Sequence, residues 1–205
     1  MADQQQEFNQ RTSELITAGQ SLYALGMVPA TSGNFSARLS NGDIAITVSG
    51  RHKGRMLDED IMRVDANGQS LDERRSSAET GLHVQIYNRI PEAKAILHPH
   101  SVNATLLSRL SGEFLQLQDY ELLKAFPGID THDCSVTVPI FQNDQNIERL
   151  AERVDDYMQS EGPIYGYLIN GHGFYTWGET VEDALRHVEA FEFLFECELR
   201  MRGVN

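Results

Sequence analysis

The sequence predicts an α/β fold with a single domain over residues 1–205, in which helices flank a central, mainly antiparallel β-sheet. The length of 205 residues and the hydrophobic content of 40% suit one well-buried domain and are too small for two of ordinary size. Short apolar runs joined by Asn41-Gly42 and Asn67-Gly68 indicate hairpins. Segments with helical periodicity alternate with these runs, so helices and hairpins are expected to share one core.

In the first half of the chain, apolar residues with mostly three- and four-residue spacing predict a helix that ends before Gly26. Ser76 lies three residues before Glu79, which is the spacing of a capping box, and Pro91 would end the helix that begins there. Residues 1–9 are expected to be flexible. The expected elements are a helix over 8–25, a hairpin of strands 35–39 and 44–48, a second hairpin within 61–71, and a helix over 76–89.

The second half predicts a buried strand, several helices and a final pair of strands. The apolar runs on either side of Asn170-Gly171-His172-Gly173 indicate two strands joined by a turn. The expected elements are strands over 95–98, 135–141, 164–169 and 174–177, and helices over 102–110, 120–125, 146–159 and 181–202.

Charge and cysteine content limit the class of partner and the compartment. A formal net charge of -13 and a pI near 4.9 repel nucleic acid and anionic membranes on average, so neither is an expected partner. The first ten residues are polar and do not resemble a secretory signal. Cys134 and Cys197 are not in a CxxC spacing and are expected to be reduced. A cytoplasmic protein is therefore expected.

Three histidines form a candidate metal site. Alternate residues of an extended segment point the same way, so His98 and His100 can present two imidazoles to one cation. His172 lies between Gly171 and Gly173, which leave room for its side chain to enter a cleft. Three imidazoles with an open position are typical of a catalytic divalent metal. On spacing alone, unrelated surface and core histidines remain an alternative.

Two glutamates are candidate catalytic residues. Glu79 could act at the site or simply cap its helix. Glu121 is three residues before Lys124, and this spacing by itself predicts a solvated surface pair.

Small polar turns offer a place for a phosphate group. Their hydroxyls and backbone N–H groups lie beside glycine or a helix N-terminus, and Lys53 adds the local positive charge that the acidic chain otherwise lacks. Each turn alone could be ordinary loop chemistry. The candidate phosphate-binding residues are Asn34, Ser49, Gly50, Lys53, Ser76 and Ser77.

Taken in order, these motifs resemble the class II aldolase family from about residue 10 to residue 202. The resemblance implies that His98, His100 and His172 hold the metal, with Zn²⁺ expected and iron, cobalt or nickel as alternatives. It also implies a class II aldolase-like sheet with helices on both sides, and a homotetramer with the site near a subunit boundary. The motifs that carry it are Ser32-Gly33-Asn34, Ser49-Gly50, Ser76-Ser77-Ala78-Glu79, His98-Pro99-His100 and Gly171-His172-Gly173.

Within the family, the run from Gly171 to Thr180 is similar to a dehydratase that acts on a small phosphorylated keto-sugar. That similarity implies that Glu121 transfers protons and that Glu79 supports the metal. A sugar-phosphate aldolase or epimerase on the same scaffold is the nearest alternative function. A metal-free, adducin-like interaction module is a remote one.

Overall fold

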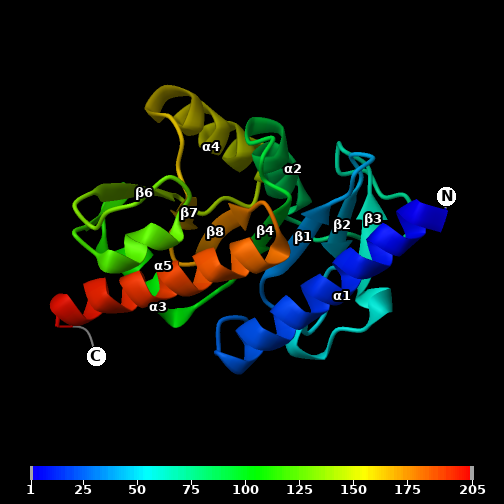
Figure 1. Ribbon diagram of the computed structural model, residues 1–205, viewed down its shortest axis with the longest axis horizontal. Helices are drawn as coiled ribbons and strands as arrows, with labels where there is room; N and C mark the ends of the chain where they lie inside the picture. The colour runs from blue at the N-terminus through cyan, green and yellow to red at the C-terminus, as the bar shows by residue number, and fades with distance from the viewer. Residues whose placement is uncertain (1, 204–205) are drawn as a thin grey trace.

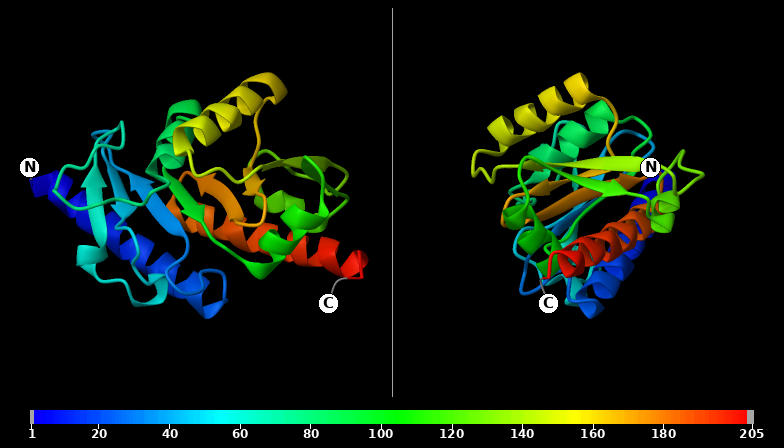
Figure 2. Two further views of the ribbon diagram at one scale, coloured as in Figure 1. Left: turned by 180° about the vertical axis from the view of Figure 1, so that it is seen from behind. Right: turned by 90° about the vertical axis from the view of Figure 1, so that its left-hand side faces the viewer.

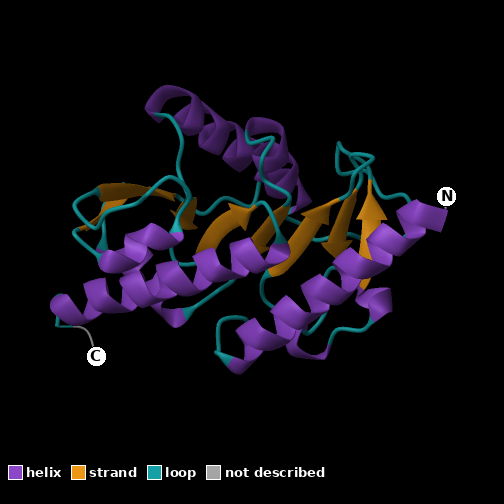
Figure 3. Cartoon of the chain, viewed as in Figure 1, coloured by secondary structure: helices purple, strands orange, loops and turns teal. Residues whose placement is uncertain are grey.

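A computed structural model describes residues 2–203, and within them eight strands form one sheet in the order β3-β2-β1-β4-β8-β7-β6-β5 (Figures 1 and 3). Neighbouring strands are antiparallel except for β6 and β7. The predicted mainly antiparallel sheet is therefore confirmed. The strands are β1 (Asn34–Arg38), β2 (Ile44–Thr47), β3 (Ile61–Val64), β4 (Ala95–His98), β5 (Phe114–Gln118), β6 (Ser135–Phe141), β7 (Gly166–Ile169) and β8 (Gly173–Gly178).

Helices cover both faces of the sheet, which gives three layers (Figure 2). On one face lie α1 (Ala2–Ala24), α3 (Val102–Leu110) and α5 (Val181–Met201), and on the other lie α2 (Thr80–Arg89) and α4 (Ile147–Glu161). Each face has its own apolar cluster, because the side chains of a strand alternate between the two faces. Short 3₁₀ helices are η1 (Lys53–Arg55), η2 (Asp58–Asp60) and η3 (Glu121–Ala125).

The pairing at the centre of the sheet positions the site. Strand β4 lies between β1 and β8, with Asn34 opposite His98 and Leu97 opposite Thr176. The C-terminal end of β4 therefore meets the beginning of β1 and the loop between β7 and β8. Three segments far apart in the sequence come together at this edge.

Several sequence-based expectations need correction. Helix α1 begins at Ala2 rather than at residue 8, and β5 was not expected at all. The chain turns at Asn67-Gly68, but beyond the turn it pairs with β3 through a single bridge from Val64 to Ser70, so the second hairpin is incomplete. Helix α2 starts at Thr80, four residues later than expected. The flexibility expected of residues 1–9 stays a prediction.

The cysteines and the helices show two further features of the chain. Cys134 and Cys197 are both free. Within residues 2–203, no helix combines the length and the apolar character needed to cross a membrane.

Candidate active site

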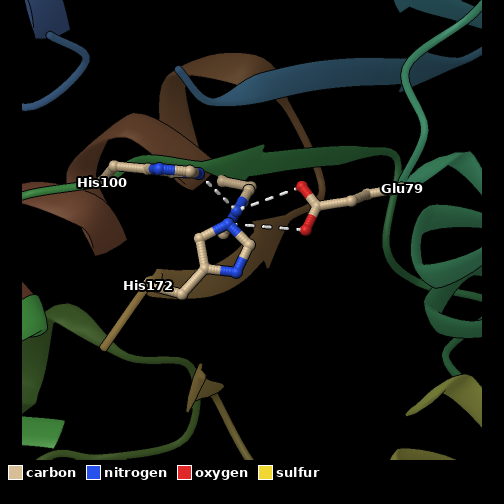
Figure 4. A group of neighbouring side chains, drawn as sticks. Glu79, His100 and His172 are labelled. Carbon is tan, nitrogen blue, oxygen red and sulfur yellow. Dashed lines mark hydrogen bonds and ion pairs between the residues drawn. The ribbon is translucent and has the colours of Figure 1, made fainter. Parts of the chain in front are cut away.

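Four side chains from three parts of the fold converge at the C-terminal end of β4 (Figure 4). Glu79 precedes α2, His98 ends β4, His100 follows two residues later, and His172 lies in the loop between β7 and β8. One potential ligand atom from each of the four lies within 4.8 Å of those of the others. We call this group the histidine–glutamate cluster.

Backbone contacts fix the two loops that carry His100 and His172. The His100 N–H donates to the Met27 carbonyl at 2.8 Å. The His172 carbonyl accepts from the Thr105 hydroxyl at 3.1 Å. Gly173 lets these loops approach each other, because a Cβ there would lie 2.3 Å from the Pro99 carbonyl oxygen. Glycine is therefore required at this position by close packing.

The ring of His98 is held by its surroundings. Its Nδ1 lies 2.8 Å from the Phe174 carbonyl, which can only accept a hydrogen bond, so Nδ1 carries a proton and Nε2 faces the cluster. The ring also stacks on Tyr175 with a centroid separation of 4.0 Å. This is the arrangement expected of a metal-ligating histidine, whose other nitrogen is usually tied to the protein.

Glu79 is an ionised carboxylate facing the histidines. Its Oε2 lies 3.3 Å from His98 Nε2 and accepts from Asn34 Nδ2 at 2.6 Å, and its Oε1 lies 3.5 Å from His172 Nε2. Burial tends to raise the pKa of this carboxyl, but His98, His172 and the Asn34 hydrogen bond outweigh burial and hold the pKa far below its usual range. The side chain makes no capping hydrogen bond to α2, so capping does not explain this residue.

The donor set of the cluster fits a divalent metal. Burial, reinforced by the neighbouring imidazoles, lowers the pKa of His100 to about 2, and burial also lowers the pKa of His172, which favours the neutral form whose lone pair can bind a metal. His98 Nε2 and His100 Nε2 are 2.8 Å apart, a separation that a proton or a shared cation between the rings satisfies. Three nitrogens and one carboxylate oxygen can hold zinc or another first-row ion.

The cluster opens onto a cleft of about 400 Å³ that contains most of the candidate phosphate-binding residues. The Lys53 side chain is 1% exposed, and its ammonium donates to the carbonyls of Arg51 at 2.7 Å and Thr31 at 3.3 Å. Burial lowers the pKa of Lys53 to about 8, although nearby Asp60 opposes this shift. Of the predicted set, Asn34, Ser49, Gly50, Lys53 and Ser77 line the cleft.

Two predicted residues lie elsewhere in this chain. Ser76 pairs with Val48 through an isolated bridge and is not among the residues that line the cleft. Glu121 is 73% exposed on η3 and accepts from Lys124 at 2.7 Å, as its spacing predicted. Within residues 2–203, Glu121 does not line the cleft either.

The sequence did not indicate one wall of the cleft. The loop between β6 and α4 contributes Asn143, Asp144 and Gln145, and α4 contributes its first residue, Ile147. Asp144 forms an ion pair with Arg149 of α4 at 2.6 Å, so its carboxylate stabilises the loop rather than facing a ligand. Asn143 and Gln145 are available for a ligand. A run of short polar residues between a strand and a helix was their only sequence signal, and it looks like an ordinary loop.

Comparison with known proteins agrees with this geometry. The profile of the class II aldolase and adducin N-terminal domain matches residues 13–199. The methylthioribulose-1-phosphate dehydratase of Methylococcus capsulatus is 61% identical over 199 residues, which are 97% of this chain and 98% of that protein. The protein of the same name from Azotobacter vinelandii is 54% identical over 198 residues, 96% of each chain.

Solved structures show the same architecture. The L-fuculose-1-phosphate aldolase of Thermus thermophilus superposes with a TM-score of 0.77 at 26% identity and covers 95% of this chain and 96% of that one. A sugar-phosphate aldolase from Thermotoga maritima superposes with a TM-score of 0.70 at 20% identity, over 95% and 96% of the two chains. The sheet order, the converging histidines and the match along almost the entire sequence place this chain in the class II aldolase and adducin family.

Proposed function

We propose that this chain is a metal-dependent hydro-lyase that converts 5-methylthioribulose 1-phosphate into 2,3-diketo-5-methylthiopentyl 1-phosphate, a step of methionine salvage. The observation that carries the proposal is a partly buried cluster of three imidazoles and a carboxylate that opens onto a cleft with a buried lysine. The chain is also 61% and 54% identical to relatives named for this reaction. These relatives, and the convergence of all four ligating groups, argue against a metal-free interaction module.

The histidine–glutamate cluster would hold the metal through His98, His100 and His172, with Glu79 beside them. We propose Zn²⁺, because nitrogen-rich sites of this size suit it, with iron, cobalt and nickel as competitors. When bound, the ion supplies Lewis acidity that polarises the C2 carbonyl and so acidifies the proton on C3.

The cleft residues orient the substrate. Lys53 lines the cleft, and two backbone carbonyls occupy two of its three ammonium donors, so one donor remains for a phosphate oxygen. Ser49, Gly50 and Ser77 surround the same space and can donate to phosphate oxygens. Arg51 does not add free charge, since its guanidinium is paired with Asp60 at 3.0 Å. Lys53 is therefore the proposed main charge for the phosphate.

The chemistry requires proton transfers at C3, at the C4 hydroxyl and in a final tautomerisation. A base removes the C3 proton, and an acid protonates the C4 hydroxyl, which leaves as water. The resulting enol takes up a proton at C4 and releases the proton of its C3 hydroxyl, which gives the C3 ketone, so the net change is the loss of one water molecule. We propose Glu121 for proton transfer. Glu121 is 73% exposed and does not line the cleft of its own chain. Each Glu121 would therefore have to reach the cleft of a neighbouring subunit.

This requirement agrees with a homotetramer whose sites lie near subunit boundaries, which we propose as the working assembly. A cytoplasmic location is also proposed, because the chain is acidic and both of its cysteines are free.

The proposal is tested by metal analysis of the purified protein together with a dehydration assay on 5-methylthioribulose 1-phosphate. We expect about one divalent ion per subunit, and loss of water that stops on chelation and returns when the ion is added back. Retro-aldol cleavage of a panel of ketose phosphates is the matched assay. Cleavage without dehydration would favour the sugar-phosphate aldolase alternative instead.

A further inference from the structure

A chain of buried polar side chains leads from Glu79 away from the cleft. Asn34 Nδ2 donates to Glu79 Oε2 at 2.6 Å, and Asn34 Oδ1 is hydrogen-bonded to His83 Nε2. His83 Nδ1 lies 2.7 Å from Ser36 Oγ, which lies 2.8 Å from the Tyr87 hydroxyl. Asn34, Ser36, His83 and Tyr87 are between 0% and 4% exposed. We call these four residues the positioning chain.

The two ends of the Asn34 amide set the direction of the hydrogen bonds in the positioning chain. The Asn34 amide nitrogen donates to Glu79 Oε2, so the amide oxygen faces His83 Nε2 and accepts from it. His83 Nε2 therefore carries the proton, and His83 Nδ1 accepts from Ser36. The Ser36 oxygen in turn accepts from Tyr87. With the other tautomer of His83, its Nε2 and the Asn34 oxygen would be two acceptors facing each other.

The far end of the positioning chain is firmly anchored. His83 and Tyr87 are one turn apart on α2, and Asn34 and Ser36 are alternate residues of β1 that face this helix. Arg38 donates to the Tyr87 carbonyl and places its guanidinium 4.6 Å from the centre of the Tyr87 ring. The orientation of His83 is thus set by packing between the helix and the sheet.

We propose that His83 is a positioning residue: its Nε2–H holds the Asn34 amide so that Asn34 donates to Glu79 and keeps one carboxylate oxygen directed at the histidines. The proposal rests on the proposed metal centre and is independent of which sugar phosphate is the substrate. Without this N–H, no group of the positioning chain decides which end of the Asn34 amide faces Glu79. Burial lowers the pKa of His83 to about 3, with His98 in support and Glu79 in opposition, so the ring stays neutral as the hydrogen-bond pattern requires.

Two polar substitutions separate positioning from simple packing. A glutamine at position 83 places its amide nitrogen near the location of Nε2, whereas an asparagine reaches only as far as Nδ1. We expect His83→Asn and His83→Leu to weaken zinc binding by about 10- to 100-fold, the usual effect of losing a group that orients a ligand. His83→Gln should recover most of that loss. In the zinc-loaded enzyme, the loss should appear in kcat more than in KM.

The matched control is His187→Leu. His187 is also almost fully buried, and its Nδ1 is hydrogen-bonded to the Trp177 carbonyl, away from the cluster. Its replacement should lower the thermal unfolding midpoint while zinc affinity stays unchanged. A purely structural His83 would behave in the same way, with equal zinc affinity in the Gln, Asn and Leu variants, and that result would overturn the proposal.

Zinc affinity is measured by calorimetry without substrate, so this test is separate from the proposed reaction. An unaltered chain that binds zinc but does not dehydrate the substrate contradicts the proposed function alone. Should His83→Leu fail to fold, the comparison of the Gln and Asn variants decides, because both keep a polar side chain. Equal zinc affinity in those two variants would be enough to reject the role of His83.

Discussion

Glu79 and Glu121 are the same residue type in two regions with opposite surroundings. The side chain of Glu79 is 13% exposed and faces three imidazoles and an amide. The side chain of Glu121 is 73% exposed and is paired with Lys124 at 2.7 Å, with His132 at 3.7 Å. Glu79 has all of its partners within its own chain. Glu121 can take part in catalysis only if a neighbouring subunit buries it. The neighbourhood, not the residue type, decides the chemistry.

The two carboxylates are both ionised at pH 7, but for different reasons. The Lys124 hydrogen bond lowers the pKa of Glu121 at the surface. Burial in a partner's cleft would act in the opposite direction and move that pKa toward the range useful for proton transfer.

The largest effect is expected from removing an imidazole of the cluster. In His98→Ala or His172→Ala, a ligand is lost and most of the bound metal should be absent. Activity should fall by at least about 10³-fold, because the metal contributes several kcal/mol to the transition state. Elemental analysis and the dehydration assay measure both effects, and circular dichroism checks the fold. His132→Ala should keep its metal, and full occupancy in His172→Ala would contradict the site.

The next effect concerns the two glutamates directly. Glu121→Gln should lower kcat by about 10²–10⁴-fold and leave metal content and substrate affinity nearly intact, as expected for a group that moves a proton. Glu79→Gln should instead weaken metal binding, because a charge beside the cation is lost. Steady-state kinetics on metal-loaded samples distinguish these outcomes. Normal turnover by Glu121→Gln, with Glu79→Gln inactive but still metal-bound, would reverse the two roles.

A subunit-mixing experiment sharpens the role of Glu121 further. If Glu121 acts in a neighbour's cleft, His98→Ala and Glu121→Gln subunits should complement each other when they are mixed. Part of the activity should return, because some clefts combine intact histidines with an intact Glu121. Co-expression with two affinity tags and an activity assay measure this. Mixed oligomers as inactive as either parent would place the acid or base elsewhere.

A smaller effect is expected for the buried lysine. Lys53→Met should raise KM for the phosphorylated substrate by about 10- to 150-fold, which corresponds to the loss of about 1.5–3 kcal/mol from a charge-assisted contact. Arg55→Met, an exposed neighbour on η1, is the control. An unchanged KM in Lys53→Met would remove Lys53 from the phosphate site.

The same lysine predicts a dependence on pH. Its pKa is lowered to about 8, so the free enzyme loses this charge as the pH rises through 8. The KM for a phosphorylated substrate should then increase by up to about tenfold per pH unit above 8, because binding requires the protonated form. Lys53→Met should lack this slope. A flat KM between pH 7 and 9 in the unaltered enzyme would contradict the assignment.

The smallest effect belongs to the surface pair. Lys124→Ala should change the free energy of unfolding by less than about 1 kcal/mol, because exposed ion pairs contribute little. Urea denaturation measures this value. A large loss of stability would show that the pair of Glu121 and Lys124 contributes to the fold, which would contradict its description as an exposed surface pair.

Local patterns in the sequence indicated most of the elements and the candidate metal ligands. His98 and His100 needed only an extended backbone to point the same way, and His172 needed only its flanking glycines. Helical and strand periodicities likewise located most elements, because they depend on residues a few positions apart. Strand β5 was missed although it alternates between buried and exposed residues, since its outward face includes the apolar Phe114.

Tertiary structure decided what no local pattern contains. The sequence leaves Glu79 either as a capping residue or as a site residue, whereas in the fold its carboxylate is held beside His98 by Asn34, a residue 45 positions away. Ser77 lines the cleft and Ser76 does not, and the wall at Asn143 comes from a distant loop. These partners meet only when the sheet order brings β1, β4 and the loop between β7 and β8 to one edge. Local periodicity fixes which residues share a face, whereas contacts between segments depend on how the whole chain packs.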